Sequence, residues 1–108
     1  MSTPADPLVY KITTRAEWQQ AEAAGVFQGS AVDRRDGFIH FSTAAQVPET
    51  ARRHFAGQAD LLLVAVDARA VALTWEPSRH GALFPHLYGP LPLSAVRGTE
   101  PFEPPAGL

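Results

Sequence analysis

One continuous apolar run limits the folds open to this chain more than any other feature. Residues Leu61 to Val66 are all apolar, which is typical of a strand that is buried on both faces in the middle of a sheet. The run is far shorter than the roughly 18 residues that a membrane-spanning helix needs. Helical patterns precede it and short strand-like segments flank it, so the sequence predicts an α+β domain with a mostly antiparallel, curved sheet.

Two helices are expected in the N-terminal half of the chain. The segment Thr14-Arg15-Ala16-Glu17 has the pattern of a capping box, in which hydroxyl and carboxylate satisfy exposed backbone N–H groups at a helix start. It predicts a first helix over about residues 15–24. Thr43 can cap a second helix with Pro48 in its first turn, where a missing N–H costs little. Residues 25–36, between the two helices, are expected to form a loop.

The length of 108 residues fits a single domain that buries roughly 65% of the surface exposed by its unfolded chain. We expect a flexible lead-in over residues 1–7 and one globular domain over 8–97. Residues 98–108, which contain several prolines, are expected to form an irregular tail.

Composition argues against several classes of partner. Nine Lys and Arg residues against eleven Asp and Glu give a net charge of −2, so a nucleic acid is an unlikely partner. The absence of cysteine removes disulfides and Cys-ligated metals. The N-terminal residues lack the basic and apolar stretches of a signal peptide. The expectation is a soluble, cytoplasmic protein without a membrane partner.

The common cofactor motifs are absent from the sequence. No histidines are paired at i, i+4 on an expected helix, and there is no His-Glu-x-x-His, so no metal is expected. Gly-x-Gly-x-x-Gly, the Walker loop and Gly-x-Ser-x-Gly are missing as well. These absences argue against a doubly wound dinucleotide-binding fold and against a serine hydrolase.

A first group of candidate site residues surrounds an expected strand over residues 37–42. Alternation places His40 and Ser42 on one face of this strand, and Thr43 follows at the turn into a helix. Hydroxyl and N–H groups at such a turn can hold an anion or a ribose. His40 could equally be a buried histidine bonded to a backbone carbonyl. Lys11, in the expected first strand, either reaches the sheet edge or points into a cleft beside His40.

A second group lies later in the chain. Glu76 follows Trp75, and a carboxylate against an apolar ring has its pKa raised, which suits acid–base chemistry. A solvent-facing carboxylate or a salt bridge to Arg79 is the alternative. His86 and Tyr88 alternate, so both side chains can face one cleft, or they can belong to a packed aromatic turn.

Three motifs together resemble the domain-of-unknown-function family 952 of small bacterial proteins. They are Asp36-Gly37-Phe38-Ile39-His40-Phe41-Ser42-Thr43, Trp75-Glu76 and Phe84-Pro85-His86-Leu87-Tyr88-Gly89. The resemblance implies an ADP-ribosyltransferase-like fold, with a split, curved, mostly antiparallel sheet around a cleft for NAD. It also implies a relationship to the RNA 2′-phosphotransferases. Lys11 stands where many relatives carry histidine.

The resemblance suggests three functions. The first is a transferase or NAD glycohydrolase that binds or cleaves NAD or a related ADP-ribose compound. Its expected catalytic residues are Glu76 and His40, and its expected ligand-binding residues are Lys11, Ser42, Thr43, His86 and Tyr88. The second is a non-enzymatic module that binds a small nucleotide-like molecule after losing catalysis. The third, an RNA 2′-phosphotransferase-like enzyme, fits least well with the negative net charge.

Overall fold

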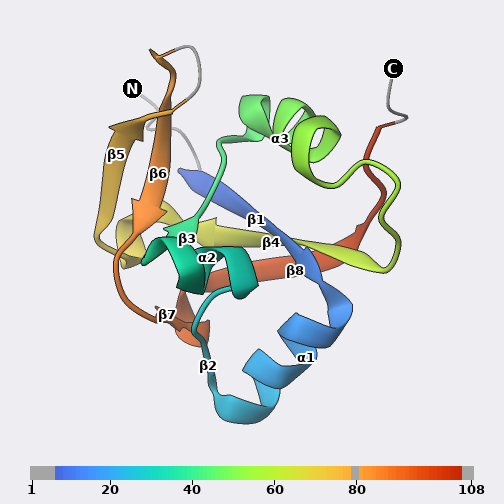
Figure 1. Cartoon of the computed structure of the whole chain (residues 1–108). Coiled ribbons are helices and arrows are strands. Elements are labelled where there is room, and N and C mark those ends of the chain that lie inside the picture. Colours follow the sequence, from blue (N-terminus) through green and yellow to red (C-terminus); the bar gives the residue numbers. More distant parts are fainter. Residues whose placement is uncertain (1–6, 79–80, 106–108) are drawn as a thin grey trace, which may run out of the picture.

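The computed structural model describes residues 7–78 and 81–105 (Figure 1). Most of the expected lead-in, the last three residues of the expected tail, and Arg79 therefore lie outside the described residues. The helices are α1 (Arg15–Ala24), α2 (Ala31–Asp36) and α3 (Val47–His54), with 3₁₀ turns at Ala44–Gln46, Ala68–Ala70 and Leu93–Ala95. The strands are β1 (Leu8–Thr14), β2 (Val26–Phe27), β3 (Ile39–His40), β4 (Leu61–Asp67), β5 (Leu73–Pro77), β6 (Leu83–Leu87), β7 (Leu91–Pro92) and β8 (Val96–Phe102).

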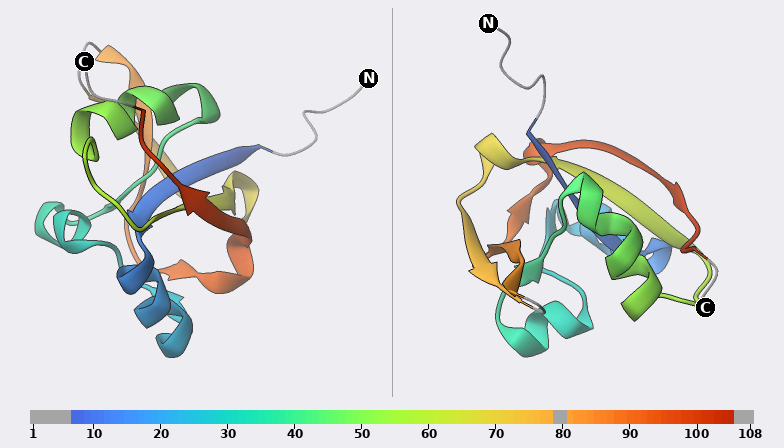
Figure 2. Two further views of the ribbon diagram at one scale, coloured as in Figure 1. Left: turned by 90° about the vertical axis from the view of Figure 1, so that its right-hand side faces the viewer. Right: turned by 90° about the horizontal axis from the view of Figure 1, so that it is seen from above.

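The described strands form three small sheets, ordered β1–β4–β8, β2–β7 and β3–β6–β5, and every neighbouring pair is antiparallel. The α+β class with a mostly antiparallel sheet is therefore confirmed. Strand β4 lies between β1 and β8, so the apolar run of the sequence is a central strand, as predicted. Figure 2 shows β4 and β8 curving along one side of the molecule and β5 along the other.

A short backbone link ties the two three-stranded sheets together. The N–H of Tyr10 donates to the carbonyl of Ser42, and the N–H of Ser42 donates back to the carbonyl of Tyr10, both at 2.8 Å. Ser42 follows β3 closely in the chain, so this link holds β3 beside β1. The position of the β3–β6–β5 sheet is thus fixed against the central sheet.

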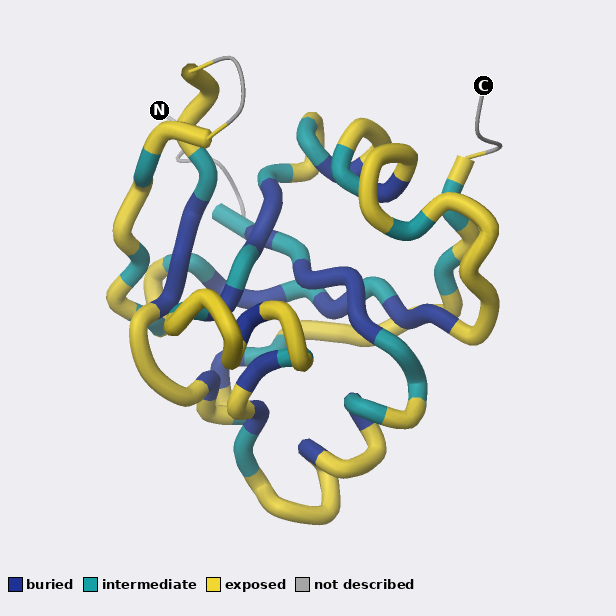
Figure 3. The backbone as a smooth tube through the Cα atoms, in the orientation of Figure 1, coloured by how far each residue is buried: buried dark blue, intermediate teal, exposed yellow. Residues whose placement is uncertain are grey.

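The core has two parts. The larger cluster joins residues of β4, β6 and α1, among them Val64, Leu87 and Trp18, all at most 6% exposed. The smaller one packs Ala51 of α3 against Ile12 of β1. Figure 3 shows the buried backbone running through the strands, while α1 and α2 present much exposed surface.

The expectation of two N-terminal helices is wrong, because α2 lies within the segment assigned to a loop. Ser30 caps α2, accepting from the N–H of Asp33, and the Asp33 carboxylate accepts from the N–H of Ser30 at 2.9 Å. Gly37 ends the helix with a φ of 90°. The first helix begins and ends where predicted, and Thr43 caps a 3₁₀ turn that leads into α3.

Two further boundaries differ from expectation. The strand predicted over residues 37–42 is regular only at Ile39–His40, because Ser42 leaves it to pair with β1. The irregular tail predicted from Gly98 begins later, since β8 continues to Phe102. Its pairing with the buried strand β4 supplies backbone hydrogen bonds that the proline-rich composition did not indicate.

Candidate functional site

One face of the β3–β6–β5 sheet carries most of the candidate residues. In the strand register, His40 lies opposite His86, and Glu76 lies opposite Phe84. Side chains two residues apart share a face, so His86 and Glu76 are diagonal neighbours on the same side of the sheet. The sequence motifs around these positions thus meet because three strands bring them together.

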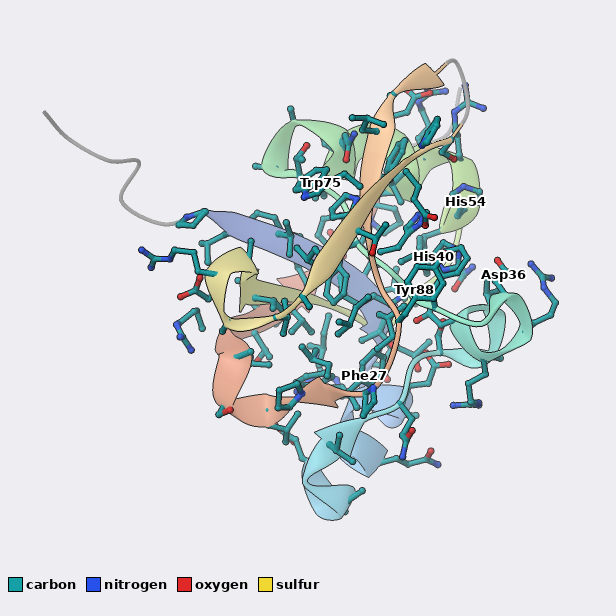
Figure 4. All side chains as sticks on the ribbon, turned by 90° about the vertical axis from the view of Figure 1, so that its left-hand side faces the viewer. Phe27, Asp36, His40, His54, Trp75 and Tyr88 are labelled. Carbon is teal, nitrogen blue, oxygen red and sulfur yellow. The ribbon has the colours of Figure 1, made fainter. Side chains whose placement is uncertain are left out.

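Four rings from this face touch one another, and we call Phe38, His40, His86 and Tyr88 the ring cluster. Phe38 is at its centre: its ring centroid lies 4.2 Å from that of His86, 4.6 Å from that of His40 and 5.2 Å from that of Tyr88. The Phe38 and His86 planes are stacked at 28°. Figure 4 shows His40 and Tyr88 side by side, with Asp36 close to them and Trp75 farther along β5. Flat, rigid rings of this kind are suited to stacking against a heterocycle.

Glu76 is bonded to two members of the ring cluster. Its Oε1 lies 2.6 Å from Nδ1 of His86 and accepts a 2.8 Å hydrogen bond from the hydroxyl of Tyr88. These two hydrogen bonds hold the pKa of the Glu76 carboxyl below its ordinary value, and the same carboxylate raises the pKa of the Tyr88 hydroxyl. Glu76 is therefore an anion at neutral pH.

The expected rise in the pKa of Glu76 is thus wrong in direction. It was based on the ring of Trp75, whose neighbouring position in the strand places it on the opposite face of the sheet. Trp75 is 45% exposed, and the Glu76 side chain is 36% exposed. Solvent and two donors together favour the charged form, and an apolar ring on the other face does not oppose them.

His40 belongs to a second carboxylate–imidazole pair. Its Nδ1 lies 2.6 Å from Oδ1 of Asp33, and its Nε2 lies 3.1 Å from Oδ2 of Asp36. The backbone N–H of His40 also donates to Asp33 at 3.2 Å. Both carboxylates come from α2, so this helix fixes the position of His40 from outside the sheet.

Asp33 is almost fully buried and also binds Lys11. The ammonium of Lys11 donates to both carboxylate oxygens, at 2.7 and 2.9 Å. Burial by itself raises the pKa of Asp33, but hydrogen bonds from His40 and the charge of Lys11 outweigh it and leave this pKa well below its usual range. Burial lowers the pKa of Lys11, and the charge of Asp33 opposes that change. Through Asp33, Lys11 and His40 thus connect β1, α2 and β3.

Three residues expected to bind a ligand have structural partners here. Lys11 is 5% exposed and paired with Asp33, so it does not reach a cleft in this structure. Ser42 is also 5% exposed, and its hydroxyl lies 3.0 Å from that of Thr50. Thr43 caps the 3₁₀ turn by accepting from the N–H of Gln46. The sequence placed these residues near the site but did not indicate that their polar groups form hydrogen bonds or ion pairs with other residues of the chain.

Asp33, Asp36 and Phe38 were not among the predicted site residues. A signal for Asp33 was present, because Ser30 and Asp33 have the spacing of a helix cap. Phe38 precedes His40 by two residues and shares its face by alternation. The contacts with Lys11 and His86 depend on strands far apart in the sequence, and no local pattern indicates them.

Among the described residues, surface hollows also lie away from the ring cluster. One, of about 190 Å³, lies between α1 and the segment from β2 to α2 and includes Glu17 and Arg34. Another, of about 350 Å³, lies between α1 and β8 and includes Trp18 and Arg97. Neither hollow includes a ring of the cluster, in which Tyr88 is exposed and His86 is buried.

The described residues contain no group of three or more His, Asp or Glu side chains arranged to hold a metal ion. In the same part of the chain, every helix is too short or too polar to cross a bilayer.

The chain is similar to solved structures of a bacterial protein, CC0527 from Caulobacter crescentus. The crystal structure of protein CC0527 from Caulobacter crescentus is 53% identical, covers 89% of this chain and 86% of its own, and gives a TM-score of 0.86. The solution NMR structure of CC0527 is 52% identical over 90% of this chain and 85% of its own, with a TM-score of 0.80. No curated protein matches the chain.

The model of a family described as protein of unknown function (DUF952) matches residues 12–99. This span contains the three motifs, the ring cluster and both carboxylate–imidazole pairs. The resemblance seen in the sequence is therefore confirmed: the chain belongs to the DUF952 family.

Proposed function

We propose that this protein binds NAD or a related ADP-ribose compound at the ring cluster and cleaves its glycosidic bond, in a fold related to that of the ADP-ribosyltransferases. The observation that carries the proposal is the anionic carboxylate of Glu76 beside stacked rings. A ring surface can hold a base or nicotinamide by stacking. An anion next to it can favour the cationic sugar that forms as the glycosidic bond breaks.

The second carboxylate oxygen of Glu76, Oε2, gives this role a specific atom. Oε1 is occupied by His86 and Tyr88, whereas Oε2 has no hydrogen-bond partner among the described residues. The two bonds on Oε1 orient the carboxylate before a ligand arrives, which is the arrangement required for electrostatic stabilisation of a developing charge. In this proposal Oε2 faces the ribose, and Tyr88 and Phe38 contact the rings of the ligand.

A non-enzymatic binding module is the second candidate, and one observation favours it. Lys11 and Ser42, expected to contact the ligand, are buried and internally paired. The remaining ring cluster retains a stacking surface with fewer polar contacts to the ribose and phosphates. Such a site binds the ligand without orienting it for cleavage.

No described feature favours RNA as a substrate. Arg15, Arg35 and Arg97 each form an ion pair with a carboxylate of the chain. Arg52 and Arg53 both pair with Glu49. These pairs neutralise the charge that a phosphate backbone would need.

The proposal is tested by measuring ADP-ribose binding and nicotinamide release from NAD in wild type, Phe38→Leu and Glu76→Gln. Phe38→Leu should weaken ADP-ribose binding about tenfold, which corresponds to roughly 1.4 kcal/mol of stacking energy. Glu76→Gln should reduce nicotinamide release far more than it reduces binding. Glu100→Gln, at an exposed position of β8, is the matched control and should change neither. Equal losses of rate and affinity in Glu76→Gln would favour the binding module, and absence of ADP-ribose binding in wild type would refute both candidates.

A further inference from the structure

We propose that His86, and not His40, is the residue that exchanges a proton with the substrate, and that Glu76 positions the His86 ring through Oε1 in addition to facing the ribose through Oε2. The two histidines are both paired with carboxylates and lie opposite each other in the sheet, with ring centroids 5.5 Å apart. They differ in which nitrogen atoms remain free.

The tautomer of His86 is determined by Glu76. An ionised carboxylate only accepts hydrogen bonds, so the 2.6 Å contact with Oε1 requires a proton on Nδ1 of His86. In the neutral ring, Nε2 then carries a lone pair and can accept a proton. Stacking against Phe38 restricts rotation of the ring and keeps Nε2 directed to one place.

Nε2 of His86 is the ring nitrogen that Glu76 does not occupy, and the residue as a whole is 7% exposed. No described residue forms a hydrogen bond with it. Within the described part of the chain, the indole nitrogen of Trp18 is the only fully buried side-chain nitrogen or oxygen without a partner. Nε2 also lacks a partner among the described residues, and because it is not among the fully buried unpaired atoms it retains some exposure. An accessible, oriented acceptor atom is the basic requirement for a general base.

His40 does not meet this requirement. Its Nδ1 contacts Asp33 and its Nε2 contacts Asp36, and both carboxylates are acceptors. Each ring nitrogen of His40 therefore already faces a carboxylate of the chain, and neither is left to face a substrate. His40 is therefore assigned to holding α2 against the sheet.

The free Nε2 also indicates the class of nucleophile, and this step relies on the proposed function for its substrate. A hydroxyl group, of water or an alcohol, attacks the anomeric carbon and forms a new C–O bond. The C–N bond to nicotinamide breaks, its electron pair neutralises the pyridinium ring, and nicotinamide leaves. The hydroxyl proton passes to Nε2 of His86 and from there to solvent.

The assignment is tested by long-range ¹H–¹⁵N correlation spectra of the histidine side chains in mildly alkaline buffer. In wild type, His86 should have a protonated Nδ1 and an unprotonated Nε2. In Glu76→Gln the neutral amide no longer enforces this tautomer, so a signal from a protonated Nε2 of His86 should appear. The control variant Glu100→Gln should show no such signal. A wild-type His86 with the proton on Nε2 and the lone pair on Nδ1 would overturn the assignment.

A second measurement connects the assignment to chemistry and uses NAD with water or methanol as acceptor. His86→Gln should lower nicotinamide release by roughly 10²-fold or more, because general-base catalysis contributes about that much. An unchanged rate in His86→Gln would reject the base, whatever the spectra show. If wild type releases no nicotinamide, the proposed function fails, while the tautomer spectra still decide whether His86 holds its proton on Nδ1.

Discussion

Replacing Asp33 with asparagine should destabilise the protein strongly, because four donors converge on this buried carboxylate. They are the ammonium of Lys11, the ring and backbone N–H groups of His40, and the backbone N–H of Ser30. An amide offers one accepting oxygen and turns the other position into a donor that faces donors. It also leaves the charge of Lys11 without a counter-charge.

The size of the effect follows from burial. The side chains of Lys11 and Asp33 are 6% and 1% exposed, and breaking a buried ion pair from one side costs about 3–5 kcal/mol. Asp60→Asn is a matched control, since it breaks the exposed pair with Arg15 and should cost about 0.2–1 kcal/mol. The double variant Lys11→Met with Asp33→Asn should be more stable than Asp33→Asn alone, because it removes the unpaired charge.

Urea unfolding followed by circular dichroism at neutral pH measures these differences, and equal slopes are required for the comparison. A cost of less than about 1 kcal/mol for Asp33→Asn, similar to that of Asp60→Asn, would refute the reasoning. So would a double variant less stable than Asp33→Asn, because the unpaired Lys11 charge would then not be the source of the loss.

Three other predictions concern pH, backbone space and the site. The pKa of Asp33 is held low in the folded state, so its contribution to stability is present above its unfolded pKa of about 4 and is lost as the pH falls below that value. The free energy of unfolding of Asp33→Asn, measured by acid unfolding, should therefore depend less on pH below about 4 than that of wild type. Gly29→Ala should lower the melting temperature in a thermal unfolding scan, because φ is +102° there and a Cβ would lie 2.7 Å from the Cβ of Asp33; an unchanged melting temperature would contradict this. Tyr88→Phe removes one of the two hydrogen bonds that lower the pKa of Glu76, so the carboxyl carbon of Glu76 should titrate at a higher pH in an NMR experiment. A fall in the pKa of Glu76 would contradict the assignment of this hydrogen bond as a cause of its low pKa.

The elements that local sequence determines were predicted well. The first helix is determined by a capping box at Thr14 and a terminating glycine at Gly25, which lie within a dozen residues of each other. The buried strand β4 is a continuous apolar run. Helix α2 was missed because it is the shortest of the three α-helices described and its cap uses Asp33 where a glutamate is the commoner partner. The C-terminal half of strand β8 was predicted to be an irregular tail, because its regularity comes from pairing with β4 and not from its own composition.

The site was predicted as a set of residues but not as a set of interactions. His40, Glu76, His86 and Tyr88 were all identified from motifs, and the structure brings them to one face. The direction of the Glu76 pKa could not be predicted, because it depends on which atoms of the neighbouring strand reach the carboxylate. The ion pair of Lys11 with Asp33 could not be predicted either, because Asp33 lies on helix α2, which was expected to be a loop.

The central claim, that the ring cluster binds a nucleotide-like ligand, is tested most directly by backbone amide shifts during titration with NAD, ADP-ribose and nicotinamide. The account predicts saturable shifts at Phe38, His40, Glu76 and Tyr88 and much smaller shifts on β8. Saturable shifts confined to the hollow beside α1 and β8, or none at high ligand concentration, would contradict it.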